Sequence, residues 1–221
     1  MNTPHTVEQS TKTERKPGDL SKPRATRRAR PNEYDFGDNI IWGSNVTLDH
    51  KATIGNNVTI GDNVVLGYGV VLHDGVTIEP GTTLQRHVEV GEGSQVGSHT
   101  LLEDNVRVGI RSTIAPNVVV LRHGRIGNGV HLGTKVVICA HSSVGDNSVI
   151  DNGCTIYARV PLGPNSHIGA RCQLASAFTG ELANDIYVLR NGDLRSLVEV
   201  HDIVTIAFPS YSTTDVCRMA E

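Results

Sequence analysis

Histidine and arginine recur in this sequence at an interval that would bring them together if residues 18 apart were neighbours. His141 follows His123 by 18 residues (141 − 123), Arg159 follows His141 by the same step (159 − 141), and His87 precedes His123 by two such steps (123 − 87 = 36). Neutral imidazole accepts protons near neutral pH, so a histidine in this column could act as a general base. Arginine binds phosphate through charge-assisted hydrogen bonds. The column therefore predicts proton transfer beside a bound anion.

We take His141 as the first candidate for the base and His123 as the second. The candidate ligands for the phosphates of a cofactor or substrate are Arg86, Arg107, Arg122, Arg125, Arg159 and His87. Nearby carboxylates dilute this positive charge. The alternative is that histidine, like asparagine, is only tolerated in a left-handed backbone conformation here, and that the arginines are solvated surface.

A period of six residues determines the elements that would position these side chains. From Phe36 to Leu174 every sixth residue is apolar, which makes 24 hexads ((174 − 36)/6 + 1 = 24). The fifth residue of a hexad is usually small or β-branched, and the fourth is mostly Asn, Gly, His, Lys or Arg. Asn, Gly and His tolerate left-handed backbone well, so each hexad is predicted to be a short strand followed by a corner. Three hexads close a triangle, and each strand pairs in parallel with the strand 18 residues later.

This pattern resembles the left-handed parallel β-helix of the hexapeptide-repeat (isoleucine patch) superfamily. The resemblance covers residues 36–179 and implies an all-β fold of about eight three-sided coils. Residues 1–35 are polar and predict a disordered N-terminal arm, and residues 180–221 predict a small C-terminal β cap. Phe178 would place a ring at the open end of the coil.

The resemblance also implies an activity, because the superfamily consists largely of acyltransferases with a catalytic histidine and clefts between subunits. The segment at residues 137–147, VICAHSSVGDN, is similar to the histidine-containing segment of the lipid A acyltransferases and sugar N-acetyltransferases. Acetyl-CoA or another acyl thioester would be the co-substrate, and a sugar or nucleotide sugar the acceptor. In those families the histidine is third in its hexad, a place that His50 occupies, whereas His141 is fourth.

Two other functions remain open at this point. The γ-class carbonic anhydrases share this fold and bind zinc through three histidines, two of them five residues apart, a spacing that no histidine pair has here. We therefore expect no metal. An uninterrupted coil would also suit a non-catalytic structural or assembly module.

One outward column is unusually apolar and predicts a subunit interface. Its members are the sixth residues of every third hexad, namely Thr47, Val65, Thr83, Leu101, Val119, Val137, Thr155 and Gln173. Such a stripe should not face water, so we expect a homotrimer of parallel prisms, as the superfamily generally forms.

Composition limits the remaining possibilities. The net charge of −3 gives no reason to expect nucleic-acid binding, and no apolar run is long enough for a membrane span. The four cysteines lack CxxC spacing, which favours a reduced, cytoplasmic protein, and Cys154 and Cys172 are predicted to be small core residues.

Overall fold

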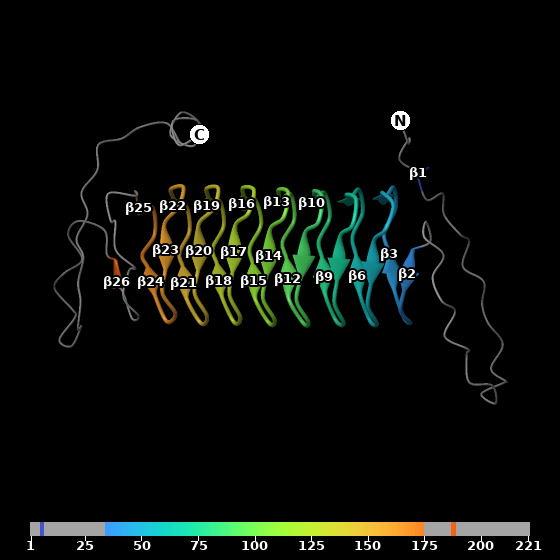
Figure 1. The fold of residues 1–221 in the computed structure, drawn as a ribbon, viewed down its shortest axis with the longest axis horizontal. Helices are drawn as coiled ribbons and strands as arrows, with labels where there is room; N and C mark the ends of the chain where they lie inside the picture. Colours follow the sequence, from blue (N-terminus) through green and yellow to red (C-terminus); the bar gives the residue numbers. More distant parts are fainter. Residues whose placement is uncertain (1–4, 7–33, 175–186, 189–221) are drawn as a thin grey trace.

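The chain winds into a three-sided prism of very short parallel strands (Figure 1). The computed structural model describes residues 5–6, 34–174 and 187–188. The 24 strands β2 to β25 contain two residues each, and three strands make one turn, which gives eight coils (24/3). The all-β, left-handed parallel β-helix predicted from the period of six is confirmed.

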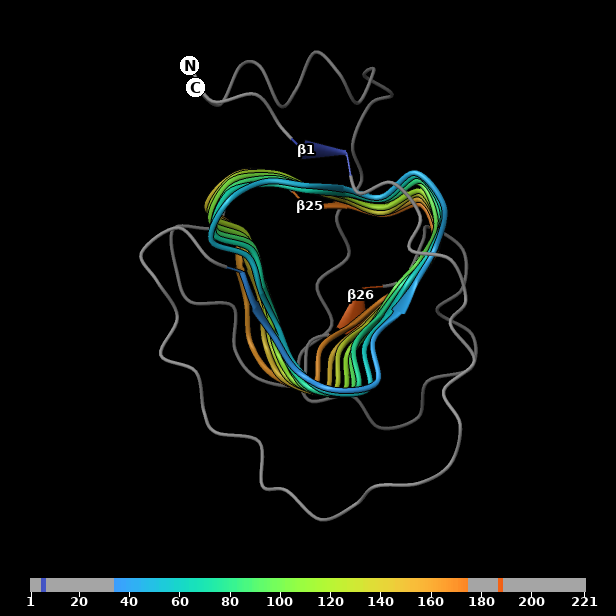
Figure 2. The ribbon, with the colours of Figure 1, turned by 90° about the vertical axis from the view of Figure 1, so that its right-hand side faces the viewer.

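Three sheets form the sides of the prism, and Figure 2 shows them end-on as a triangle. Sheet A consists of β1 (His5–Thr6), β4 (Thr47–Leu48), β7 (Val65–Leu66), β10 (Thr83–Leu84), β13 (Leu101–Leu102), β16 (Val119–Val120), β19 (Val137–Ile138), β22 (Thr155–Ile156) and β25 (Gln173–Leu174). Sheet B consists of β2 (Asp35–Phe36), β5 (Thr53–Ile54), β8 (Val71–Leu72), β11 (Glu89–Val90), β14 (Arg107–Val108), β17 (Arg125–Ile126), β20 (Ser143–Val144) and β23 (Pro161–Leu162). Sheet C consists of β3 (Ile41–Trp42), β6 (Thr59–Ile60), β9 (Thr77–Ile78), β12 (Gln95–Val96), β15 (Thr113–Ile114), β18 (His131–Leu132), β21 (Val149–Ile150), β24 (His167–Ile168) and β26 (Tyr187–Val188).

The register is 18 residues for every parallel pair from β2 to β25, as in the pairing of Thr83 with Leu101. The corners that keep this register lie at the fourth residue of each hexad. All 23 fourth residues from Asn39 to Arg171 ((171 − 39)/6 + 1 = 23) have positive φ, between 52° and 72°. Seventeen of them are not glycine, so the predicted left-handed corners are confirmed throughout the described coils.

The core fills the prism with the first and fifth side chains of each hexad. Ile54 and Val58 are 1% and 0% exposed, and the same alternation repeats in the following coils. Several fifth residues are buried hydroxyls that bond to the backbone instead of leaving polar atoms unpaired. Ser112 Oγ donates to the Gly127 carbonyl at 2.7 Å and accepts from the Val130 amide at 3.1 Å. Among the described residues, every buried side-chain nitrogen and oxygen has a partner.

Cys154 and Cys172 also occupy inward positions, one coil apart. Both are buried, and Cys154 Sγ donates to the Gly169 carbonyl at 3.0 Å. The hydrogen bond with Cys172 and burial raise the pKa of the Cys154 thiol well above its usual range. A thiol held in its protonated form is a poor nucleophile, which agrees with the prediction that these are core residues.

The N-terminal end of the prism carries an aromatic cluster. The rings of Tyr34 and Phe36 stack at 5.5 Å, and Phe36 meets Trp42 edge-on at 5.5 Å. The edge of sheet A at this end pairs antiparallel with β1. At the other end β26 pairs in parallel with β24. Most of the predicted arm (1–35) and cap (180–221), with Phe178, lie outside the described residues.

Candidate active site

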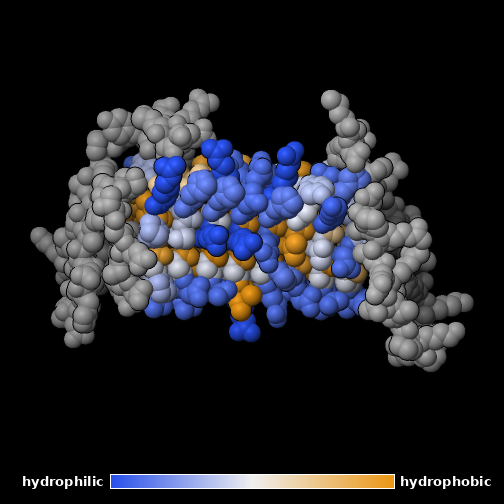
Figure 3. All heavy atoms as spheres, viewed as in Figure 1, coloured by the Kyte–Doolittle hydropathy of each residue, from blue (hydrophilic) through white to orange (hydrophobic). Residues whose placement is uncertain are grey.

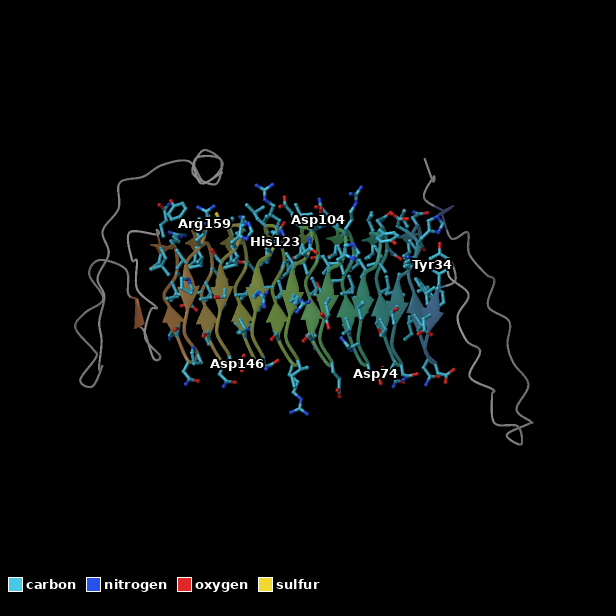
Figure 4. The ribbon with its side chains drawn as sticks, in the orientation of Figure 1. Tyr34, Asp74, Asp104, His123, Asp146 and Arg159 are labelled. Atoms are coloured by element: carbon cyan, nitrogen blue, oxygen red, sulfur yellow. The ribbon has the colours of Figure 1, made fainter. Side chains whose placement is uncertain are left out.

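The predicted histidine column lies along one edge of the prism, which we call the A–B corner because the chain passes there from sheet A to sheet B. Its fourth residues are Lys51, Gly69, His87, Asn105, His123, His141 and Arg159, all with φ between 55° and 67°. Figure 4 shows His123 and Arg159 on this edge with Asp104, whereas Asp74 and Asp146 lie on the opposite edge of the same face. The 18-residue spacing therefore does bring the predicted column together.

An open groove of about 520 Å³ runs along this corner and onto sheet B. Two neighbouring columns form its walls. The lining residues are Gly69, His87, Asn105 and His123 from the corner, and Val71, Glu89, Arg107 and Arg125 from the outward positions of sheet B. Figure 3 looks onto this face and shows hydrophilic side chains along both of its edges and in a cluster at the middle of the prism.

Parallel pairing explains why the two columns run side by side. In each coil the corner residue precedes the outward residue of sheet B by two positions, as in His123 and Arg125. Glu89 pairs with Arg107 and Arg107 with Arg125, so these three side chains are in register on successive strands. In three successive coils the groove therefore places an imidazole or amide next to a charged group.

The two candidate bases are in direct contact. The imidazoles of His123 and His141 stack with their centroids 4.8 Å apart and their planes at 17°. His123 lines the groove, whereas His141 lies one coil further on and packs against it. The geometry thus favours His123 as the group that reaches a bound substrate.

His87 is held by its surroundings in the preceding coils. Its ring meets Tyr68 edge-on at 5.4 Å, and Lys51 Nζ lies 5.5 Å from the centre of that tyrosine ring. Gly69 leaves room for the imidazole, because a Cβ at this glycine would lie 2.8 Å from His87 Nδ1. These contacts fix the position of His87 in the groove wall.

Glu89 is the single carboxylate among the groove-lining residues. Its Oε1 lies 3.1 Å from His73 Nε2, and its Oε2 lies 3.7 Å from Arg107 Nε. The Glu89 side chain is 42% exposed and that of Arg107 is 65% exposed, so both can reach a ligand. Arg125 also lines the groove, one coil beyond Arg107.

The remaining predicted anion ligands do not line the groove. Arg86 and Arg122 are third residues of their hexads, on the sheet-A side of the corner, and both are exposed. The Arg86 amide donates to Asp104 Oδ1 at 2.9 Å, and the Arg122 amide donates to Glu103 Oε2 at 3.0 Å. Arg159 lies on the corner two coils beyond His123. His50 lies in the first coil, with its ring 6.4 Å from that of Tyr34.

Sequence reasoning missed Val71 as a lining residue and treated Glu89 only as dilution of the positive charge. Both belong to the outward column of sheet B, which the same 18-residue step connects to Arg107 and Arg125. Following the sixth residue of each of these hexads, two positions after the corner, as well as the corner itself, would have identified both groove walls.

In the part of the chain that the structure describes, no group of three His, Cys, Asp or Glu side chains is arranged to hold a metal ion. None of the described segments forms a helix that could cross a bilayer.

Comparisons with known proteins agree with the fold. The family described as "Bacterial transferase hexapeptide (six repeats)" matches residues 39–74, and "Hexapeptide repeat of succinyl-transferase" matches residues 143–158. A search of curated proteins found no significant match.

Among solved structures, the UDP-N-acetylglucosamine acyltransferase of Francisella novicida superposes with a TM-score of 0.61 at 16% identity. The match covers 64% of this chain and 58% of that one, so this chain spans less than two thirds of its structural relative. PerB of Caulobacter crescentus, solved with CoA and GDP-perosamine, gives a TM-score of 0.48 at 22% identity, over 51% of this chain and 52% of that one.

The repeats and the coil define the class of this protein. It is a hexapeptide-repeat protein with a left-handed β-helix fold.

Proposed function

We propose that this protein is an acyltransferase that moves an acetyl or longer acyl group from a CoA or carrier thioester to a sugar or nucleotide-sugar acceptor. The observation that carries the proposal is the groove in which His123 lies beside Arg125 and Arg107. A base next to two cations suits the activation of a hydroxyl or amine on a phosphate-bearing substrate.

In the proposed reaction His123 takes the proton from the acceptor hydroxyl or amine as its oxygen or nitrogen attacks the thioester carbonyl. A new C–O or C–N bond forms, the carbon–sulfur bond breaks, and the imidazolium returns the proton to the leaving thiolate. The products are the acylated acceptor and a free thiol. No proton is gained or lost overall, so the histidine is regenerated in each cycle.

The arginines divide into two groups by position. Arg107 and Arg125 would hold an anionic group within about one coil of His123, roughly 5 Å along the prism. Arg86 and Arg122 lie on the sheet-A side of the corner and Arg159 lies two coils beyond His123, so these three would contact other phosphates of the ligand. The arm of CoA is comparable in length to about four residues, roughly 14 Å when extended, so its phosphates would lie well away from the reacting carbonyl.

The fold of the Francisella enzyme is compatible with this proposal, since that protein is an acyltransferase built on the same coil. A shared fold does not by itself carry an activity, so the groove is the feature that supports acyl transfer. A homotrimer would place the apolar column of sheet A against a neighbouring subunit, right beside the A–B corner. The neighbouring subunit would then close one side of the open groove.

Thermal melting with acetyl-CoA, free CoA and zinc tests the proposal, because a ligand that binds only the folded state raises the midpoint. We expect both CoA compounds to raise it. Arg159→Gln should reduce that shift, whereas Arg111→Gln, at a corner on the far edge of sheet B, should not. A shift with zinc alone would contradict the proposal and favour an anhydrase-like site between subunits.

One observation favours a second candidate function. The 24 two-residue strands follow one another without an inserted loop. Such a regular prism would suit a structural spacer or assembly module that works through shape alone. The absence of any midpoint shift with the CoA compounds would support this alternative.

A further inference from the structure

The charged residues of the groove are not mixed at random but follow an order along the prism. The outward column of sheet B presents Val71, Glu89, Arg107 and Arg125 on four successive coils. The groove is therefore apolar at one end, acidic in the next coil, and basic in the two coils after that. A ligand that lies along it meets a negative charge and then two positive charges.

We propose that this groove binds a dipolar ligand in one direction, with an ammonium group at Glu89 and a phosphate at Arg107 and Arg125. The inference deepens the proposed function, on which it rests, by naming the acceptor class as a phosphorylated compound that also carries an amine. Glu89 and Arg125 are two coils apart, roughly 10 Å along the prism at the backbone. Flexible side chains can shorten this span, which suits the separation of amine and phosphate across one sugar ring.

The contacts of Glu89 support its role as a binding group. The carboxylate is oriented by His73 at 3.1 Å, and its distance to Arg107 of 3.7 Å leaves that contact loose. A side chain 42% exposed, in a groove wall, can accept hydrogen bonds from a ligand ammonium without breaking a tight ion pair. A site that served only anions would gain nothing from this carboxylate, because it repels them.

The two arginines support the phosphate end. They are directly opposite each other on paired strands, an arrangement of like charges that is unfavourable without a counter-ion. Glu89 is within reach of Arg107 only, and Arg125 is a full coil further from it. A phosphate between the two guanidinium groups would neutralise both, and Asn105 beside them offers an amide for sugar hydroxyls.

Isothermal titration of the full chain with two sugar phosphates tests the inference. Glucosamine 6-phosphate and glucose 6-phosphate share the ring and the phosphate and differ only in the amine. We expect the amino sugar to bind roughly threefold to fivefold more tightly, in the upper part of the range for partly exposed charge pairs. Glu89→Gln should weaken the binding of glucosamine 6-phosphate and strengthen the binding of glucose 6-phosphate by a similar factor, so the preference is lost. Arg125→Gln should weaken the binding of both ligands.

Glu92→Gln is the matched control. Glu92 lies in the same coil as Glu89 but at the far corner of sheet B, so the substitution removes the same charge away from the groove. It should leave the preference intact. Three results would each overturn the inference. They are a change of affinity in the same direction for both ligands on Glu89→Gln, equal affinities in the unmodified protein, and no binding of either sugar phosphate. Acyl transfer is assayed separately. Discrimination without turnover would contradict the proposed function, and with it the role of the ligand as acceptor, but would leave its directional binding in the groove standing.

Discussion

At the scale of single residues, the shape of the groove depends on what each corner position leaves free. Gly69 and Gly75 have nearly the same backbone, with φ of +67° and +68°. Their surroundings differ, because a Cβ on Gly69 would meet His87 Nδ1 at 2.8 Å while the nearest atom to a Cβ on Gly75 is 3.8 Å away. Substitutions at these two glycines therefore distinguish the effect of backbone strain from a steric effect on the groove.

We predict that Gly69→Ala and Gly75→Ala each lower the free energy of unfolding by about 1 kcal/mol through the left-handed backbone. Gly69→Ala should cost more, because the His87 ring must move. Urea denaturation measures the stability, and titration with glucose 6-phosphate measures the groove. Equal effects of the two variants on both measurements would show that His87 is not held as described.

At the scale of elements, short ladders of side-chain oxygens support the corners. At the corner between sheets B and C, Asp74 Oδ1 accepts from the Asn56 amide at 2.8 Å and Oδ2 accepts from Asn56 Nδ2 at 3.1 Å. These two hydrogen bonds, the backbone one first, lower the pKa of Asp74 below its usual value of 3.8. The folded state therefore favours the carboxylate.

This shift predicts a stability change in acid. The pKa of Asp74 is lower in the folded state than in the unfolded state. The ionised side chain therefore contributes fully to the free energy of unfolding above about pH 3.8, and this contribution is lost as the pH falls below that value. Between pH 5 and pH 3, about the window of this titration, Asp74→Asn should lose less stability than the unmodified protein. Asparagine can replace the aspartate at such a corner, because Asn152 accepts a hydrogen bond from the Thr134 amide at 2.7 Å at another corner. Thermal midpoints of both proteins at several pH values measure the difference. Identical pH profiles of the Asp74→Asn variant and the unmodified protein would contradict the prediction.

The elements were predictable from sequence to an unusual degree, because one rule decides them all. The inward residues Ile54 and Val58 and the corner residue Asn57 follow from period and backbone tolerance alone. The groove was only partly predictable. The corner column correctly predicted that His87 and His123 lie together. Arg86 and Arg107 were both named as ligands but lie on different sides of the corner, since Arg86 precedes it and Arg107 follows it. The stacking of His123 on His141 depends on side-chain rotamers, which the repeat does not determine.

At the scale of the whole molecule, the apolar column of sheet A predicts assembly. Val65 is 38% exposed, and Leu101, Val119 and Val137 are half-buried on the same face. We predict a particle of about three times the chain mass of 23.8 kDa. Val119→Glu should dissociate it, because a charge at the centre of an apolar interface is not solvated.

Light scattering coupled to size-exclusion chromatography measures both species. Thr113→Glu, at a half-buried outward position of sheet C, is the control and should remain trimeric. A monomer in the unmodified protein would contradict this prediction, and the column would then need another cover.

The central claim is that the groove is a site of acyl transfer in which His123 is the base. The most direct measurement is the steady-state rate of thiol release from acetyl-CoA in the presence of glucosamine 6-phosphate, for His123→Asn and for His99→Asn. Asparagine keeps both left-handed corners, as Asn105 and Asn117 do in the unmodified protein, and His99 lies on another edge. We predict that His123→Asn lowers kcat at least about 100-fold, whereas His99→Asn retains the unmodified rate. A His123→Asn protein with full activity would contradict the account.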